Sequence, residues 1–254
     1  MLAQSAIGVK SFKKKLFLKL AALLGLYRNV IFHATNTKEK EDIIREVGSK
    51  TVVRVAPNLH KLNFKEETTP IEKKVNELRL VSIARVSPEK NLLQLLEALS
   101  TQTENITLDI YGTQYNKGYW EKCKEQIDSA PVNIKINYKG VIEPNQIEST
   151  IEKYHFLVLL SLGENFGHVI LESFMAARPV IISNQTPWSH LIEKCLGWDI
   201  ALNSSTEINS VLTSAAKMTQ AEFDVLINSR KNYAQTIISD KDIIKQSVTL
   251  FSTE

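Results

Sequence analysis

The chain has 254 residues, 43% of them hydrophobic, which is enough for a sizeable core in one large or two small domains. Lys and Arg number 31 and Asp and Glu 28, and the resulting net charge of +3 is too small to indicate a nucleic-acid partner. Cys123 and Cys195 are far apart and lack metal-ligand spacing, so a disulfide framework or zinc site is not indicated and a cytoplasmic setting is expected. No run approaches the roughly 20 apolar residues of a membrane span, and nothing at the start resembles a cleaved signal.

The N-terminal segment predicts a basic amphipathic helix over residues 11–26. Its lysines and large apolar residues are Lys10, Lys13, Lys14, Lys15, Lys19, Phe12, Leu16, Phe17, Leu18, Leu20, Leu23 and Leu24. Such a helix can lie on an anionic membrane surface, with partial burial of its apolar side. More commonly it packs its apolar stripe on a neighbouring domain, and both arrangements stay open.

Strands and helices alternate along the rest of the chain, on either side of a break near residues 61–77. Before the break we expect a strand Val30–His33, a helix Thr37–Val47 and a strand Val52–Ala56. After it we expect a strand Leu78–Ala84, helix Asn91–Ser100, strand Ile106–Tyr111, helix Asn116–Asp128, strand Asn133–Tyr138, a helix opened by Pro144, strand Phe156–Leu160, helix His168–Ala177, strand Pro179–Ser183, a helix opened by Pro187, and two or three helices over residues 205–252. This alternation indicates parallel β-α-β units in a doubly wound sheet, with ligands at the carboxyl ends of the strands.

Two glutamates stand eight positions apart around one predicted helix start, in the run Gly163-Glu164-Asn165-Phe166-Gly167-His168-Val169-Ile170-Leu171-Glu172. A helix N-terminus presents unpaired N–H groups and partial positive charge, which stabilise a pyrophosphate. Gly167 would let a ligand approach the backbone closely, and the carboxylate of Glu172 can accept two hydrogen bonds from a ribose diol. The plainer alternative is that Glu164 merely complements the charge of a helix start and that Glu172 is a solvated helical residue.

Two basic residues follow the first strand after the break, in Ala84-Arg85-Val86-Ser87-Pro88-Glu89-Lys90-Asn91. Arg85 offers a planar fork and Lys90 a point charge, both suited to a pyrophosphate, and we expect them on the same rim as Glu164. In isolation such residues are more often simply solvated. No G-x-G-x-x-G or G-x-x-x-x-G-K-[ST] occurs, which argues against dinucleotide and P-loop sites.

Together these two stretches resemble the E-x7-E motif and the G-R-x-x-x-x-K-G loop of family-4 retaining nucleotide-sugar glycosyltransferases. The resemblance implies a GT-B fold of two Rossmann-like domains, in which Glu164 lies beside the donor sugar, Glu172 holds the ribose, and Arg85 and Lys90 neutralise the leaving nucleoside diphosphate. It further implies a donor site completed by backbone around Gly140, Val141, Ile142, Asn165, Phe166, Gly167, His168 and Val169. It implies neither a cofactor nor a bound metal.

Some positions depart from the family pattern or match it weakly. Ala84 and Asn91 stand where glycine is usual, and so does Arg178, for which the sequence offers no explanation. The run Thr186-Pro187-Trp188 with Gly197-Trp198 resembles a signature of polysaccharide-assembly members, but ordinary helix-start and core roles explain it equally well. Asp240-Lys241-Asp242 is better explained by a capping box of Ser239 and Asp242, and Gln185 and His190 by helix-surface roles.

The resemblance divides the chain into a remnant of an N-terminal acceptor domain (1–64), a linker (65–77), a donor-binding domain (78–236) and a C-terminal helix (237–254). We therefore expect transfer of a sugar, with retention, from a nucleotide-sugar donor to a glycan or lipid-linked acceptor in cell-surface polysaccharide assembly. Such a chain would be weak or inactive without an acceptor domain, which a second polypeptide could supply, and peripheral membrane contact is a further expectation. The alternatives are a nucleotide-sugar-binding module without turnover and, less favoured, a sugar-nucleotide epimerase or phosphorylase relative.

Overall fold

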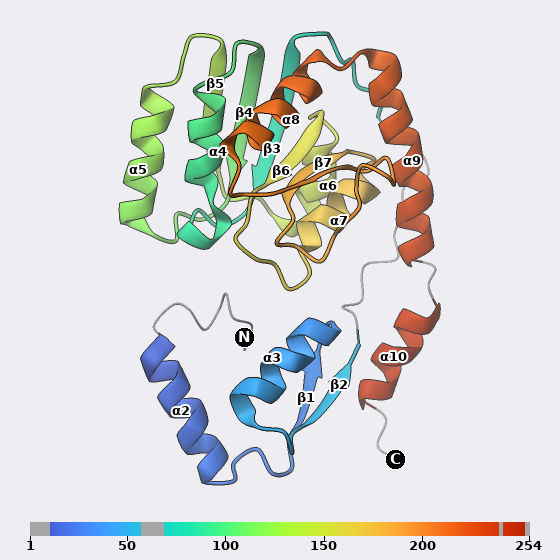
Figure 1. The fold of residues 1–254 in the computed structure, drawn as a ribbon. Coiled ribbons are helices and arrows are strands. Elements are labelled where there is room, and N and C mark those ends of the chain that lie inside the picture. Colours follow the sequence, from blue (N-terminus) through green and yellow to red (C-terminus); the bar gives the residue numbers. More distant parts are fainter. Residues whose placement is uncertain (1–10, 57–68, 239–240, 252–254) are drawn as a thin grey trace. The chain divides into compact units, whose positions relative to one another are not determined.

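The computed structural model describes residues 11–56, 69–238 and 241–251 (Figure 1). The chain forms two compact units, one of residues 1–62 with 238–254 and the other of residues 63–237. Part of the expected break at 61–77 and the expected cap at Ser239 lie outside the described residues.

The larger unit is built on a six-stranded parallel sheet in the order β5-β4-β3-β6-β7-β8. The strands are β3 (Glu77–Ile83), β4 (Asn105–Tyr111), β5 (Ile134–Gly140), β6 (Phe156–Leu159), β7 (Val180–Ser183) and β8 (Gly197–Ile200). The strand order reverses between β3 and β6, which is where a doubly wound sheet opens a crevice for ligands. The doubly wound parallel sheet expected from the sequence is confirmed, in a mixed α/β fold.

Helices join these strands or follow the last of them, β8, as the ribbon shows (Figure 1). They are α4 (Leu92–Leu99), α5 (Lys117–Asp128), α6 (Ile147–Ile151), α7 (His168–Met175), α8 (Ser205–Lys217) and α9 (Gln220–Ile238), with 3-10 turns η1 (Pro88–Lys90) and η2 (Pro144–Gln146). Residues of α4, α5 and α8 share one apolar core with alternate residues of β3 and β4. Successive strands β3, β4 and β5 step toward one edge of the sheet, and β6, β7 and β8 step toward the other. Because crossovers between parallel strands are right-handed, α7, which joins β6 to β7, covers the face opposite to the one covered by α4.

One expected element is wrong, and one strand escaped the sequence patterns. No helix follows Pro187, because the segment forms turns in which His190 and Cys195 have left-handed φ angles of 58° and 53°. The carboxylate of Asp199 also accepts the backbone N–H groups of His190 and Leu191, at 3.1 and 2.9 Å, which holds the turn. Asp199 lies in the unexpected strand β8, where a side chain on Gly197 would fall 1.9 Å from a carbonyl oxygen of β7. The other expected elements after the break are present, with ends displaced by one or two residues.

Arg178, the residue without a sequence explanation, is a buried cross-link of this unit. Its guanidinium donates to carbonyl oxygens of Thr69 (2.7 Å), Glu152 (2.6 Å), Ala177 (3.1 Å) and Ala176 (3.4 Å), and it is fully buried. Burial lowers the pKa of this guanidinium to about 10. The arginine therefore joins the segment that enters the unit to the ends of α6 and α7, and supplies donors to carbonyls that helix ends leave unpaired.

The smaller unit contains α2 (Ser11–Leu23), β1 (Ile31–Ala34), α3 (Thr37–Val47), β2 (Val52–Val55) and α10 (Lys241–Phe251). β1 and β2 pair in parallel, and Arg54 of β2 donates to the carbonyl of Thr249 in α10 at 2.9 Å. The start of α3 is a capping box, in which Asn36 accepts the N–H of Glu39 while the Glu39 carboxylate accepts the N–H of Thr35, each at 2.8 Å.

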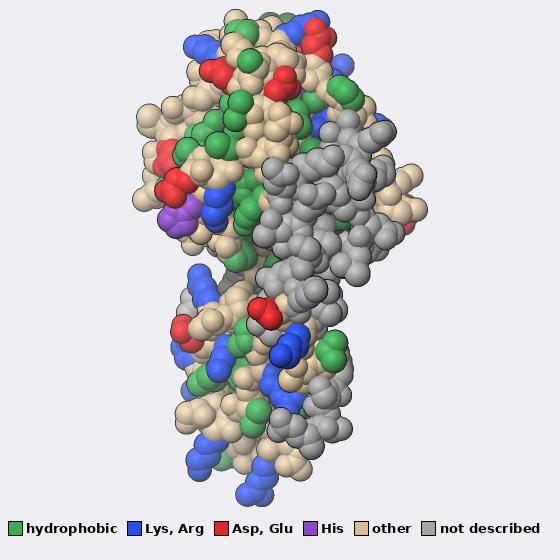
Figure 2. All heavy atoms as spheres, turned by 90° about the vertical axis from the view of Figure 1, so that its right-hand side faces the viewer, with side chains coloured by type: hydrophobic (Ala, Val, Ile, Leu, Met, Phe, Trp, Pro, Cys, Tyr) green, Lys and Arg blue, Asp and Glu red, His purple; other side chains and the backbone are tan. Residues whose placement is uncertain are grey.

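Helix α2 ends three residues before the expected residue 26 and exposes much of its apolar surface. Leu18 and Ala21 are buried, whereas Phe17 is 64% and Leu23 84% exposed. Residues 1–62 contain twelve Lys and Arg but four Asp and Glu, and Lys and Arg outnumber acidic side chains on the face of this unit seen in Figure 2. No helix within the described ranges is long and apolar enough to cross a membrane.

Candidate functional site

The candidate site is built from loops that leave the carboxyl ends of neighbouring strands. The loop after β3 pairs with the loop after β4, since the N–H of Val86 donates to the Thr113 carbonyl at 2.8 Å and that of Tyr115 to the Val86 carbonyl at 3.1 Å. Only glycine fits at position 112, where the two loops approach closely, because a Cβ atom there would lie 1.8 Å from the carbonyl oxygen of Ala84. The strand ends are thus held at one level, and their loops form a continuous rim.

The loop from Arg85 to Asn91 positions one basic side chain over the centre of this rim. η1 ends at Asn91, which has a left-handed φ of 55° before α4 begins. Asparagine tolerates this conformation better than most residues, so it can stand where the resembling family has glycine. The turn directs the ammonium of Lys90 onto the carboxylate of Glu164, in the loop that follows β6.

Glu164 is held from two sides. Its Oε1 accepts from Lys90 Nζ and, at 2.6 Å, from the hydroxyl of Ser161, which is fully buried. The side chains of Lys90 and Glu164 are 19% and 11% exposed, so water screens this pair less than it screens an ordinary surface salt bridge. The loop is also tied to its neighbours, because Leu162 N–H donates to the Glu89 carbonyl at 2.9 Å.

Arg85 lies on the same rim but has different contacts. Its guanidinium carbon stands 4.9 Å from the ring centroid of Tyr115, and Nη2 lies 3.7 Å from Glu89 Oε1. The side chain is 54% exposed, so it can turn toward a ligand at little cost. Tyr115 was missed in the sequence; its one signal is that it follows a strand end marked by Gly112.

Helix α7 begins at the rim, directly after Gly167. Gly167 is the N-cap, with φ 78° and ψ 61°, and neither a capping side-chain hydrogen bond nor an acidic residue in the first turn serves this helix start. The first-turn N–H groups, including those of His168 and Val169, give the edge a partial positive charge. Glu172 lies one turn further on and is half-buried.

Trp188 packs against the loop that contains Glu164 and Phe166. Its indole Nε1 donates to the Phe166 carbonyl at 2.5 Å, and the two rings meet edge to face with centroids 5.3 Å apart. Phe166 also lies 5.0 Å from the ring of His168, which is exposed. The weak Thr186-Pro187-Trp188 match therefore marks a buried support of the loop rather than a helix start.

The remaining expected residues divide into those at the rim and those elsewhere. Gly140 ends β5 with a left-handed φ of 79°, and it is followed by exposed Val141 and half-buried Ile142. The carbonyl of Gln185 accepts the Glu164 N–H at 3.4 Å, so its backbone belongs to the rim. His190 is exposed beside Glu193 and belongs to the turn held by Asp199.

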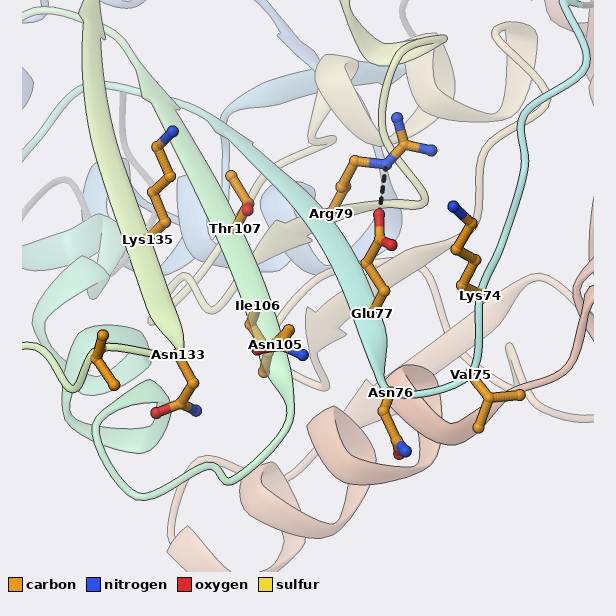
Figure 3. Close-up of a pocket in the computed structure, with 11 residues that line it drawn as sticks. Lys74, Val75, Asn76, Glu77, Arg79, Asn105, Ile106, Thr107, Asn133 and Lys135 are labelled. Carbon is orange, nitrogen blue, oxygen red and sulfur yellow. Dashed lines mark ion pairs between the residues drawn. The ribbon is translucent and has the colours of Figure 1, made fainter.

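A cavity of about 470 Å³ lies at the opposite, amino end of β3, β4 and β5 (Figure 3). It is lined by Lys74, Val75, Asn76, Glu77, Arg79, Asn105, Ile106, Thr107, Val132, Asn133 and Lys135. Arg79 points toward Glu77, with 3.8 Å between Nε and Oε1, and its Nη2 donates to the Glu72 carbonyl at 2.9 Å. Because ligands of doubly wound sheets bind at the carboxyl ends of the strands, we do not take this cavity as the candidate site.

Comparison with known proteins adds a family and a set of related folds. The family model described as "Glycosyl transferases group 1" matches residues 63–231, more than half of the chain. Alpha-monoglucosyldiacylglycerol synthase of Streptococcus pneumoniae is 25% identical over 139 residues, which are 54% of this chain and 31% of that protein. The chain thus spans less than a third of this curated relative.

Solved structures of low sequence identity share the fold. Anabaena HepE in complex with UDP-glucose has a TM-score of 0.71 at 17% identity, covering 94% of this chain and 68% of that one. Sucrose-phosphate synthase of Thermosynechococcus elongatus has a TM-score of 0.70 at 16% identity, covering 99% and 65%. A Staphylococcus aureus TarM variant in complex with fondaparinux, alpha-GlcNAc-glycerol and UDP has a TM-score of 0.66 at 15% identity, covering 87% and 43%.

Proposed function

The chain belongs to the group 1 family of glycosyl transferases, and on that premise we propose that its carboxyl rim binds a nucleotide-sugar donor for sugar transfer. The observation that carries the proposal is the convergence of Lys90, Glu164 and the N-terminus of α7 on one edge of the sheet. A pyrophosphate is stabilised by such a helix start, and a fixed carboxylate beside it can face the sugar. The structure of HepE with UDP-glucose supports the choice of ligand class.

The roles follow from the positions of the side chains. Arg85 and Lys90 supply positive charge for the leaving nucleoside diphosphate, which makes a metal ion unnecessary. Glu172 on the second turn of α7 holds the ribose, and backbone of residues 140–142 faces the base. Glu164 stabilises positive charge that develops at the anomeric carbon, and transfer proceeds with retention.

The acceptor in this proposal is a glycan or a lipid-linked sugar. The name of the curated relative specifies a glycolipid product, and the TarM structure contains glycan-like ligands. Polypeptide beyond the 254 residues, in the same or a second chain, would hold this acceptor against the donor. The exposed apolar residues of α2 and the excess of basic residues in 1–62 suit contact with that polypeptide or with an anionic membrane.

We expect the chain to bind a nucleoside diphosphate in the presence of EDTA, and Arg85→Ala to weaken that binding. Loss of charge-assisted contacts costs about 1.5–3 kcal/mol, which is a tenfold or greater rise in Kd. Titration calorimetry with UDP, GDP and ADP measures both results. Lys135→Ala, which removes a basic side chain at the opposite end of the strands, is the matched control and should leave Kd unchanged.

Absence of binding to all three nucleotides at millimolar concentration would refute the donor site. Binding that appears only when Mg²⁺ replaces EDTA would refute the metal-independent part alone. A chain that binds nucleotide and still transfers nothing when the acceptor-holding polypeptide is present would instead be a binding module.

A further inference from the structure

We propose that Ser161 is a positioning residue that fixes the reacting carboxylate of Glu164 in one orientation. The inference rests on the proposed function, since it deepens the role of Glu164 at the donor sugar. Ser161 stands just after β6 and was not singled out by any sequence motif.

The known hydrogen-bond donors to the Glu164 carboxylate meet at one of its two oxygens. Both Lys90 and Ser161 donate to the same oxygen of Glu164, Oε1, so two side chains hold this oxygen from different directions. An anchored Oε1 limits rotation of the carboxylate, so Oε2 is presented in one place. Positioned charge is worth more in catalysis than mobile charge, because it needs no reorganisation as the reaction proceeds.

Ser161 is itself held rigidly. Its carbonyl accepts from the hydroxyl of Ser183, at the end of β7, at 2.5 Å, and both serines are fully buried. The hydroxyl of Ser161 reaches Glu164 at 2.6 Å, so a buried connection runs from β7 through the end of β6 to the carboxylate.

Ser161 and Lys90 differ in what else they can bind. Lys90 is proposed to serve the diphosphate, and an ammonium shared between a carboxylate and a phosphate cannot hold either in a fixed direction, since its donors rotate. The hydroxyl of Ser161 is buried beneath the rim, out of reach of a phosphate, and serves the carboxylate alone. Ser161 therefore keeps Glu164 in place when a donor engages Lys90.

The test is a double-mutant cycle in binding, which requires no turnover. Calorimetry measures the ratio of Kd for UDP to Kd for UDP-glucose in the wild type, Ser161→Ala, Glu164→Gln and the double variant. We expect Ser161→Ala to change this ratio by about fivefold or more, with the Kd of UDP itself unchanged, because a hydrogen bond to the sugar-facing group is lost. In the Glu164→Gln background the same substitution should change nothing further.

Ser173→Ala is the matched control, because Ser173 is equally buried and donates to a carbonyl oxygen at 3.0 Å, but has no contact with Glu164. An unchanged ratio in Ser161→Ala, or an equal change in the Glu164→Gln background, would overturn the positioning role. Failure of the wild type to bind any of UDP, GDP and ADP would instead refute the proposed function.

A second measurement is independent of the donor sugar. The crystal structure of Ser161→Ala with a nucleoside diphosphate bound, which engages Lys90, should show the Glu164 side chain in more than one rotamer, and Ser161→Thr, which keeps the hydroxyl, should restore a single one. A single wild-type position in Ser161→Ala would contradict the inference.

Discussion

Glu164→Gln is expected to lower the rate of sugar transfer by about 100- to 1,000-fold while leaving the Kd of UDP nearly unchanged. The estimate is the usual loss when one preorganised group that stabilises developing charge is removed. Gln nearly keeps the size of the side chain, so the substitution removes the negative charge, and with it the ion pair with Lys90, without leaving a cavity. The measurement is release of UDP from UDP-glucose with an added glycan or glycolipid acceptor and the polypeptide that holds it, together with calorimetry for UDP.

Glu172→Gln is the matched variant in the same motif, and it should change the Kd of UDP rather than the rate of sugar transfer. It stands on the second turn of α7, where the proposal places the ribose, so the Kd of UDP should rise about tenfold as a charged acceptor is lost. Equal effects of the two substitutions on UDP affinity would contradict the division of roles between these carboxylates.

Arg178→Met should lower the free energy of unfolding of the larger unit by about 3–5 kcal/mol, because each buried carbonyl oxygen left without a donor costs about 1–3 kcal/mol and some can find other partners. Four carbonyl oxygens lose their donor, and methionine can fill the space but cannot donate to them. Arg178→Gly, the residue usual in the resembling family, should be at least as destabilising, because it also leaves a cavity. Urea unfolding followed by circular dichroism measures the change.

Lys124→Met is the control for Arg178, since it breaks an exposed pair with Glu121 (3.6 Å) on α5 and should cost less than about 1 kcal/mol. If Arg178→Met costs no more than Lys124→Met, the buried arginine does not stabilise the unit as described.

The sequence predicts most of the fold because the central strands are short apolar runs that only a parallel sheet buries on both faces. Phe156–Leu159 and Val180–Ser183 are of this kind and are fully buried. The strand Gly197–Ile200 escaped because four residues containing a Trp and an Asp show neither an apolar run nor a clear alternation. The expected helix after Pro187 failed for a tertiary reason, namely that Asp199 of β8 holds a turn in which His190 has a left-handed φ, which a helix cannot contain.

The site shows the same limit. Glu164, Glu172 and Lys90 lie in motifs, and the pairing of Lys90 with Glu164 follows from two strand-end loops meeting at one edge. Tyr115 carries no motif, because its contact with Arg85 joins two loops far apart in sequence. Ser161 is only three residues from Glu164 but stands outside the motif, and Trp188 stands in a signature that ordinary core roles explain equally well. Arg178 could not be explained from sequence, since its partners are backbone carbonyls, which leave no trace in residue identity.

The donor nucleotide is proposed to bind at the carboxyl rim, and amide NMR spectra of the ¹⁵N-labelled chain, titrated with UDP in EDTA, locate the nucleotide site directly. We expect the largest shift changes at the carboxyl rim, in residues 140–142 and 164–169, with little change at Asn76, Asn105 and Thr107 around the cavity at the amino ends of the strands. Changes concentrated around that cavity, or none with UDP, GDP and ADP at millimolar concentration, would contradict the placement of the donor site.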